Sequence, residues 1–148
     1  MSETHWRLQA PGATSGRMNV QAFDHVGIRV TDRKRALAFY ADLGFVADPA
    51  FTTDRVAEVI SADGVRINLI FNGEPRPDGR NVLLDEEQRW PGYTHAAFII
   101  ERLQSLIDWA AKRNVPITEG PHDWGRRYTC FIRDPDGNVL EFNELKQS

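Results

Sequence analysis

In each half of the chain, hydrophobic and polar positions alternate in short runs, and one stretch between these runs has helical spacing. Residues 23–30 form a β-rich run in which His25, Gly27 and Arg29 share one face, so they predict a strand. Thr31-Asp32 then offers a helix N-cap, and Gly44 predicts the helix end. An extended stretch at 45–47 and strands at 55–61 and 65–71 follow. The order is therefore β-α-β-β-β. Between cap and end, the helical stripe consists of Ala36, Leu37, Phe39, Tyr40 and Leu43.

The same order returns in the second half of the chain. A strand is expected at 94–100, an extended stretch at 115–118, and strands at 128–133 and 138–143 around a turn at 134–137. Residues 73–92 carry three prolines and three glycines, which predicts an inter-unit linker or a loop over the site. The helical stripe of this half consists of Leu103, Leu106, Ile107 and Ala110.

The two halves also match in sequence, which predicts a duplicated unit. Residues 23–30 align with 93–100 at an offset of 70, and 63–69 align with 136–142 at an offset of 73. Two β-α-β-β-β units have open sheet edges and exposed faces, so they must pair with each other or with a second chain. We expect an α+β fold in which the two units form a half-open eight-stranded barrel with flanking helices. The domain spans 21–148, with units at 21–72 and 93–145, after a flexible arm at 1–20.

The duplication places four polar residues at matched positions. His25 matches His95, and Asn68 matches Glu141. Two imidazoles and a carboxylate are a ligand set for a borderline divalent cation, and Asn68 can add a weak neutral oxygen or support the other ligands. As an ordinary strand residue, Glu141 would be buried between Leu140 and Phe142 with no positive partner, which costs several kcal/mol. The pattern therefore predicts one divalent metal ion per site.

Composition narrows the class of partner. The chain has 148 residues and a formal net charge of −3, with no basic stripe, so nucleic acid and anionic membrane are not expected partners. No apolar run reaches membrane-spanning length, and the first residues lack the apolar core of a signal peptide. Cys130 is the only cysteine, which excludes an intramolecular disulfide. We expect a cytoplasmic protein that acts on a small molecule.

Residues 25–30 and 133–142 resemble the glyoxalase / bleomycin-resistance / extradiol-dioxygenase superfamily, the vicinal oxygen chelate fold. The resemblance covers about residues 22–145. It implies a metal that binds a substrate through two adjacent oxygens. It also implies paired units that come from one chain or are exchanged between two, usually in a homodimer. The metal would be Ni, Zn, Co, Mn or Fe(II).

Within this superfamily, the residues near the predicted ligands resemble those of glyoxalase I. That enzyme isomerises the glutathione hemithioacetal of a 2-oxoaldehyde to a thioester. Arg29 and Asn72 fall four residues after His25 and Asn68, where glyoxalase I contacts glutathione. The resemblance makes Glu141 the base that removes the C1 proton. Asn68 stands where bacterial glyoxalase I has Glu, which removes one candidate base.

Two alternatives stay open. An Fe(II) extradiol dioxygenase is favoured by Gly120-Pro121-His122 and by the stretch 130–141, but the tyrosine of that signature is Phe131 here unless Tyr128 substitutes. The stretch 93–95 resembles a thiol transferase of the fosfomycin-resistance kind, whereas Gly27 replaces the catalytic threonine of those transferases. A non-catalytic drug-sequestering module is the other form of this alternative, and it would not need His25, His95 and Glu141. A rim or mobile flap over an anionic substrate is expected from Trp90, Trp124, Arg126 and Arg127, and the candidate substrate-binding residues are Arg29, Asn72, His122, Trp124, Arg127 and Tyr128.

Overall fold

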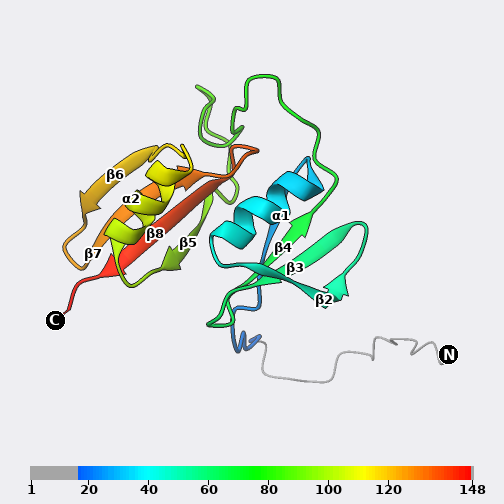
Figure 1. The fold of residues 1–148 in the computed structure, drawn as a ribbon, viewed down its shortest axis with the longest axis horizontal. Coiled ribbons are helices and arrows are strands. Elements are labelled where there is room, and N and C mark those ends of the chain that lie inside the picture. The colour runs from blue at the N-terminus through cyan, green and yellow to red at the C-terminus, as the bar shows by residue number, and fades with distance from the viewer. Residues whose placement is uncertain (1–16, 148) are drawn as a thin grey trace.

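The computed structural model describes residues 17–147, and it consists of two similar halves (Figure 1). The first half contains β1 (Val26–Arg29), α1 (Arg33–Asp42), β2 (Val46–Thr52), β3 (Val56–Ile60) and β4 (Arg66–Ile70). The second contains β5 (His95–Ile99), α2 (Leu103–Lys112), β6 (Glu119–Asp123), β7 (Arg127–Arg133) and β8 (Val139–Leu145). The α+β class and the two βαβββ units are confirmed. Residues 1–16, most of the expected arm, lie outside the described part.

Each half forms its own four-stranded sheet, and the two sheets do not close into a barrel. The strand orders are β1-β4-β3-β2 and β5-β8-β7-β6. In each sheet the first strand runs parallel to the last, and the other pairs are antiparallel. Gly27 pairs with Asn68 in one sheet, and Ala97 pairs with Glu141 in the other. The two halves, which match in sequence, therefore also pair their first and last strands in the same register.

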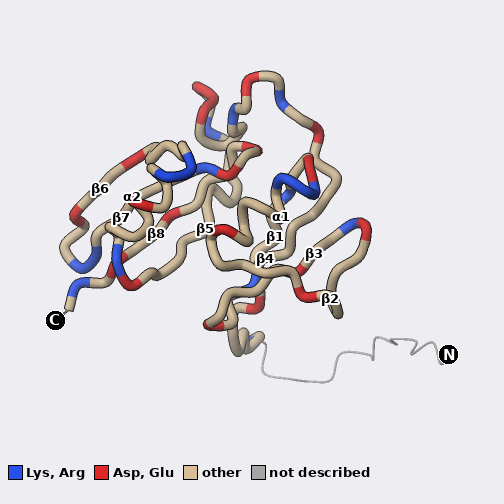
Figure 2. Tube along the Cα trace, viewed as in Figure 1, with Lys and Arg blue, Asp and Glu red and all other residues tan. Residues whose placement is uncertain are grey.

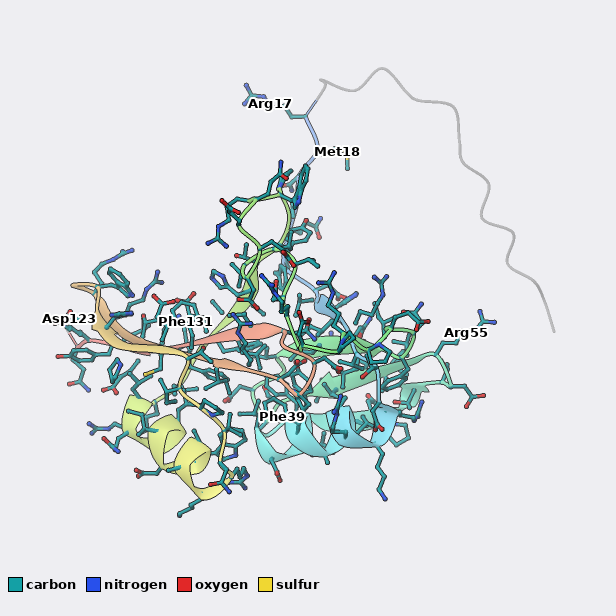
Figure 3. The ribbon with its side chains drawn as sticks, turned by 90° about the horizontal axis from the view of Figure 1, so that it is seen from above. Arg17, Met18, Phe39, Arg55, Asp123 and Phe131 are labelled. Carbon is teal, nitrogen blue, oxygen red and sulfur yellow. The ribbon has the colours of Figure 1, made fainter. Side chains whose placement is uncertain are left out.

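Both helices cover the same side of the two sheets (Figure 3). Side chains alternate along each strand, so one row packs beneath a helix and the next faces away. In β4, Ile67 and Leu69 are fully buried in the core, while Asn68 between them points to the other side. We call that other side the open face. It carries Asn68 in the first half and Glu141 in the second.

Contacts between the halves fix them side by side within one chain. Thr31 donates through its backbone N–H and its hydroxyl to the carboxylate of Asp136, at 3.1 and 2.5 Å. The Trp109 indole on α2 donates to the carbonyl oxygen of Asp42 at the end of α1, at 2.8 Å. Tyr40 on α1 bonds Asp134 in the turn between β7 and β8. These polar contacts, most of them partly or fully buried, give the halves one fixed arrangement.

The segment 73–92 contains no helix or strand and is tied down at the same turn. Asp85 forms a bidentate ion pair with Arg133, with one N–O distance of 2.7 Å. The Asn81 side-chain amide donates to the carbonyl oxygen of Gly137 at 3.2 Å. Gly137 has a φ of 82°, and a Cβ there would lie 2.6 Å from the carbonyl oxygen of Gly79. Only glycine fits this close approach, so the segment is a docked loop and not a free linker.

Two strands differ from the sequence prediction. β2 continues to Thr52, and the extended stretch expected at 115–118 lies instead at residues 119–123, where it forms β6. β6 contains Gly120 and Pro121, pairs antiparallel with β7 and has a register shift between Glu119 and His122. Edge strands tolerate proline and irregular register because one side needs no hydrogen-bond partner.

Charged side chains of both signs are interspersed over the chain (Figure 2). Within residues 17–147 no helix is long and apolar enough to cross a membrane.

Candidate metal centre

The second half brings two predicted ligands into contact. His95 begins the edge strand β5, and Glu141 lies on the neighbouring strand β8. The His95 Nε2 atom lies 2.8 Å from Glu141 Oε2, and the Glu141 side chain is only 9% exposed. His95 Nδ1 lies 2.9 Å from the Thr94 hydroxyl, and the Phe131 ring packs edge-on against the imidazole. The imidazole and the carboxylate are thus oriented toward one point on the open face.

The first half offers the matching pair in a less complete form. His25 directly precedes β1, and its Nδ1 lies 2.5 Å from the carboxylate of Asp24. This hydrogen bond lowers the pKa of Asp24. Asn68 Oδ1 is buried and has no hydrogen-bond partner, the one such side-chain atom among the described residues. Leaving a buried acceptor unpaired costs about 1–3 kcal/mol, so this oxygen needs a partner from outside the chain.

The two pairs do not meet within one chain. The described residues contain no group of three or more His, Cys, Asp or Glu side chains that could hold a metal ion. Of the two open arrangements, a site within one chain or a site across two, the described residues of the single chain therefore do not form the first. The reason is the arrangement of the sheets, whose helices lie on one side, so that the two open faces look in the same direction and not at each other (Figure 3).

A groove of about 480 Å³ runs between the halves. Residues of β1, β5, the loop 73–83 and the turn 135–139 line it, and they include Arg29 and His95. The Arg29 Nε atom donates to Asn72 Oδ1 at 3.0 Å, so these two candidate substrate-binding residues are in contact. This bond leaves the other guanidinium N–H groups and the amide N–H₂ for a ligand, a pairing suited to a carboxylate.

The remaining candidate residues lie on the β6–β7 hairpin. His122 Nε2 lies 3.2 Å from Glu119 Oε1, and the His122 and Trp124 ring centroids are 5.1 Å apart. Trp124 and Arg126 are in the tight turn, where the Trp124 backbone N–H bonds the carbonyl oxygen of Arg127. The structure does not bring these residues to the His95–Glu141 pair.

Tyr128 lies on the opposite side of its strand from the site. β7 pairs with β8 without a bulge, and Phe131 is the partner of Glu141. Because side chains alternate along β7, Tyr128 lies on the side of the strand opposite Phe131. It shares that side with the buried residues Cys130 and Ile132. Within its own chain, the Tyr128 phenol therefore lies away from Phe131 and Glu141. The Lys146 ammonium lies over the Tyr128 ring, 4.5 Å from the ring centroid.

The donor set fits a divalent cation if it is completed across two chains. Two neutral imidazoles, one carboxylate and one amide oxygen are suitable ligands, and Asn68 Oδ1 has a lone pair with no present partner. A cation would also offset the cost of burying the Glu141 charge.

Sequence reasoning missed one acidic residue on the open face. Glu58 on β3 is the register partner of Asn68. The duplication gave no signal for it, because the matched position in the second half is the aromatic Phe131.

Comparison with known proteins agrees with this architecture. The model of the family described as Glyoxalase/Bleomycin resistance protein/Dioxygenase superfamily matches residues 22–142. The metallothiol transferase FosB of Staphylococcus saprophyticus is 30% identical over 127 residues, which cover 84% of this chain and 77% of FosB. A glyoxalase/dioxygenase from Nostoc punctiforme has a TM-score of 0.70 at 22% identity, with 87% of this chain and 94% of that chain covered. Fosfomycin resistance protein FosX from Listeria monocytogenes, solved with Mn(II) and sulfate, has a TM-score of 0.64 at 17% identity, with 86% and 93% covered.

Proposed function

Because the chain belongs to the glyoxalase/bleomycin resistance protein/dioxygenase superfamily, we propose that it is a divalent-metal-dependent isomerase of the glyoxalase I type. Its substrate would be a glutathione hemithioacetal or a similar small molecule with two adjacent oxygens. Its site would be built across a homodimer. His25 and Asn68 come from one protomer, and His95 and Glu141 come from the partner.

The observation that carries this proposal is the division of the ligands into two half-sites. Each half presents its pair on the open face, at matching strand registers, but the pairs are apart in one chain. In a symmetric dimer, the second half of each copy could lie over the first half of its partner. The His95–Glu141 pair of one copy would then meet the His25–Asn68 pair of the other, and the dimer would contain two such sites.

Exposed apolar side chains support the presence of a second copy. Phe23 and Tyr93 stand at matched positions two residues before the two histidines and are 83% and 100% exposed. Ile99 on the open face of β5 is 69% exposed. Large apolar groups around a polar site favour coverage by another protein surface.

The chain's own residues then divide the chemical work. A bound divalent cation would polarise the two substrate oxygens and make the C1 hydrogen more acidic. Glu141 would accept that proton, because the carboxylate is held at the site by its contact with His95. Arg29 and Asn72 would bind the peptide carboxylate and amide groups of the thiol portion.

The direct experiment is an assay of the purified, metal-loaded protein with methylglyoxal and glutathione. Growth of the thioester absorbance is the expected result, and Glu141→Gln should reduce it by about 10²-fold or more. A metal-loaded protein that forms no thioester would contradict the reaction assignment. Oxygen uptake with catechols under Fe(II) would instead favour the extradiol alternative, for which Phe131 supplies no phenol beside His95.

Transfer of a thiol to an electrophilic substrate is the second candidate. It is favoured by the similarity to the metallothiol transferase FosB and by a three-ligand set whose fourth position is the neutral Asn68. Loss of free thiol on incubation with fosfomycin, with no reaction of the hemithioacetal, would select this candidate.

A further inference from the structure

A cavity of about 450 Å³ lies beside the His95–Glu141 pair in the second half of the chain. The strands β7 and β8 contribute Phe131 and Val139 to its lining. Phe131 is the register partner of Glu141, and its ring lies edge-on to the His95 imidazole with the centroids 5.6 Å apart. Val139 is the register partner of His95. A molecule held by the two predicted ligands therefore has this cavity within reach of its substituents.

The loop 73–92 completes the lining with the apolar side chains of Leu83, Leu84 and Trp90. Leu83 packs closely against Gly92, where a Cβ atom would lie 3.0 Å from the Leu83 side chain. The loop connects the two repeated units and belongs to neither, so the duplication does not require these residues. The cavity is therefore formed by this loop together with the second sheet.

The charged groups around the cavity are already engaged by other parts of the chain. Each of the three charged side chains in the lining has a polar partner: Arg133 donates to Asp85, Arg89 donates to the carbonyl oxygen of Leu84, and Glu119 Oε1 lies 3.2 Å from His122 Nε2. The surface left for a ligand is mostly apolar, and it includes the rings of Phe131 and Trp90. Aromatic rings prefer edge-to-face or offset-stacked contacts with one another, so such a surface favours an aromatic ligand group.

We propose that this cavity binds an aromatic substituent of the substrate, next to the two adjacent oxygens that the metal ion would hold. The inference rests on the proposed function, in which His95 and Glu141 belong to the metal site. Under the glyoxalase assignment, the hemithioacetal of an aryl 2-oxoaldehyde such as phenylglyoxal is then preferred over that of methylglyoxal. A methyl group would leave most of the apolar lining in contact with water, whereas a phenyl group buries more of it.

Two hydroxamates test the substituent separately from the reaction. Acetohydroxamate and benzohydroxamate offer a metal ion the same two adjacent oxygens, and they differ in a methyl against a phenyl group. Calorimetric titration of the Mn²⁺-loaded protein should give a Kd for benzohydroxamate about tenfold or more below that for acetohydroxamate, since a single methylene in an apolar pocket already changes affinity by about this factor. Equal Kd values would overturn the inference.

Two substitutions in the cavity should weaken this preference. Trp90→Ala removes an aromatic contact and Leu84→Trp fills the space, so each should lower the ratio of the two Kd values by about threefold or more. Phe51→Ala is the control and should keep the wild-type ratio, because Phe51 is an aromatic residue on β2 that is 63% exposed and does not line the cavity. A ratio that neither cavity variant changes would contradict the proposal. Loss of Mn²⁺ from Trp90→Ala would assign the loop to the metal site and would also overturn it.

The remaining outcomes separate this inference from the reaction assignment. A preference for phenyl in a protein that forms no thioester from either aldehyde would overturn only the reaction. Thioester formation from methylglyoxal without a preference for phenyl would overturn only the role of the cavity, and failure to bind either hydroxamate would overturn both. If Leu84→Trp weakens the dimer in sedimentation analysis without changing the Kd ratio, a side chain of the partner subunit fills the cavity, and the inference is wrong.

Discussion

Tyr40 donates a hydrogen bond of 2.9 Å to Asp134, and this buried contact joins the first half of the chain to the second. Tyr40 is fully buried on α1, while Asp134 lies in the turn between β7 and β8. Burial raises the pKa of the Tyr40 hydroxyl and also that of the Asp134 carboxyl, although hydrogen bonds from Asn138 and Tyr40 oppose the second shift. The contact fixes the halves side by side, the arrangement that separates the metal ligands within one chain.

Replacement of Tyr40 by Phe should destabilise the protein by about 1–3 kcal/mol, because a buried Asp134 oxygen loses a donor. Urea unfolding followed by circular dichroism measures the change. Tyr93→Phe is the matched control, since Tyr93 is fully exposed and should show no comparable loss in this assay. Equal effects of the two substitutions would mean that the Tyr40 hydroxyl does not join the halves.

The ion pair between Asp85 and Arg133 should hold the loop 73–92 in a pH-dependent way. Hydrogen bonding to Arg133 keeps the pKa of Asp85 well below its ordinary value near 3.8. Because the folded-state pKa is depressed, this stabilisation is fully present above the ordinary pKa and is lost as the pH falls below it. Hydrogen exchange of residues 76–90 should therefore increase, relative to β8, in acid below about pH 4.

At pH 7, Asp85→Asn should produce the same loop opening, because the amide cannot pair ionically with Arg133. Glu87→Gln, in the same loop, controls for the loss of a charge. If the rate of hydrogen exchange of residues 76–90 in Asp85→Asn equals that in the Glu87→Gln control, the ion pair does not restrain the loop.

Removal of individual ligands should affect metal binding unequally. His25→Ala, His95→Ala or Glu141→Gln should abolish stoichiometric binding, since each supplies a strong donor. Asn68→Ala should weaken affinity by about 10–100-fold, in the range seen when a supporting group is lost. Elemental analysis after dialysis and calorimetric titration with Mn²⁺ or Zn²⁺ provide the measurements. Metal content that does not respond to any of these substitutions would place the ion elsewhere.

Substitution of Arg29 should separate binding from chemistry. Arg29→Ala removes a guanidinium already oriented by Asn72, so KM for the glutathione adduct should rise about tenfold or more while kcat changes little. Arg29→Lys should recover only part of the loss, because an ammonium cannot form the bidentate contact. A fall in kcat at unchanged KM would contradict a role in substrate binding.

Much of the fold followed from the sequence because the duplication constrains it twice. The offsets of 70 and 73 made the two halves equivalent, and the structure pairs equivalent residues, Gly27 with Asn68 and Ala97 with Glu141. β6 was placed four residues too early in the sequence, at 115–118, because the apolar residues Val115 and Ile117 precede the edge strand, which contains Gly120 and Pro121.

The site was predicted less completely than the fold. His95 and Glu141 are in contact, as the matched positions suggested. The separation of His25 from them was not predictable, because it depends on which side of each sheet the helices cover and on contacts such as Thr31 to Asp136 across 105 positions. The pairing of Glu58 with Asn68 was not predicted, because sequence periodicity alone does not identify cross-strand partners.

The central claim, a metal site shared between two protomers, is tested most directly by mixing two inactive variants. His25→Ala disables the first half of a chain, and Glu141→Gln disables the second. Unfolding the two together and refolding them gives mixed dimers in which one of the two shared sites contains only intact halves. Random pairing predicts that about a quarter of wild-type metal binding and turnover returns, although each variant alone has none. If the four ligands came from one chain, every site would carry a defect, and no recovery on mixing would contradict the account.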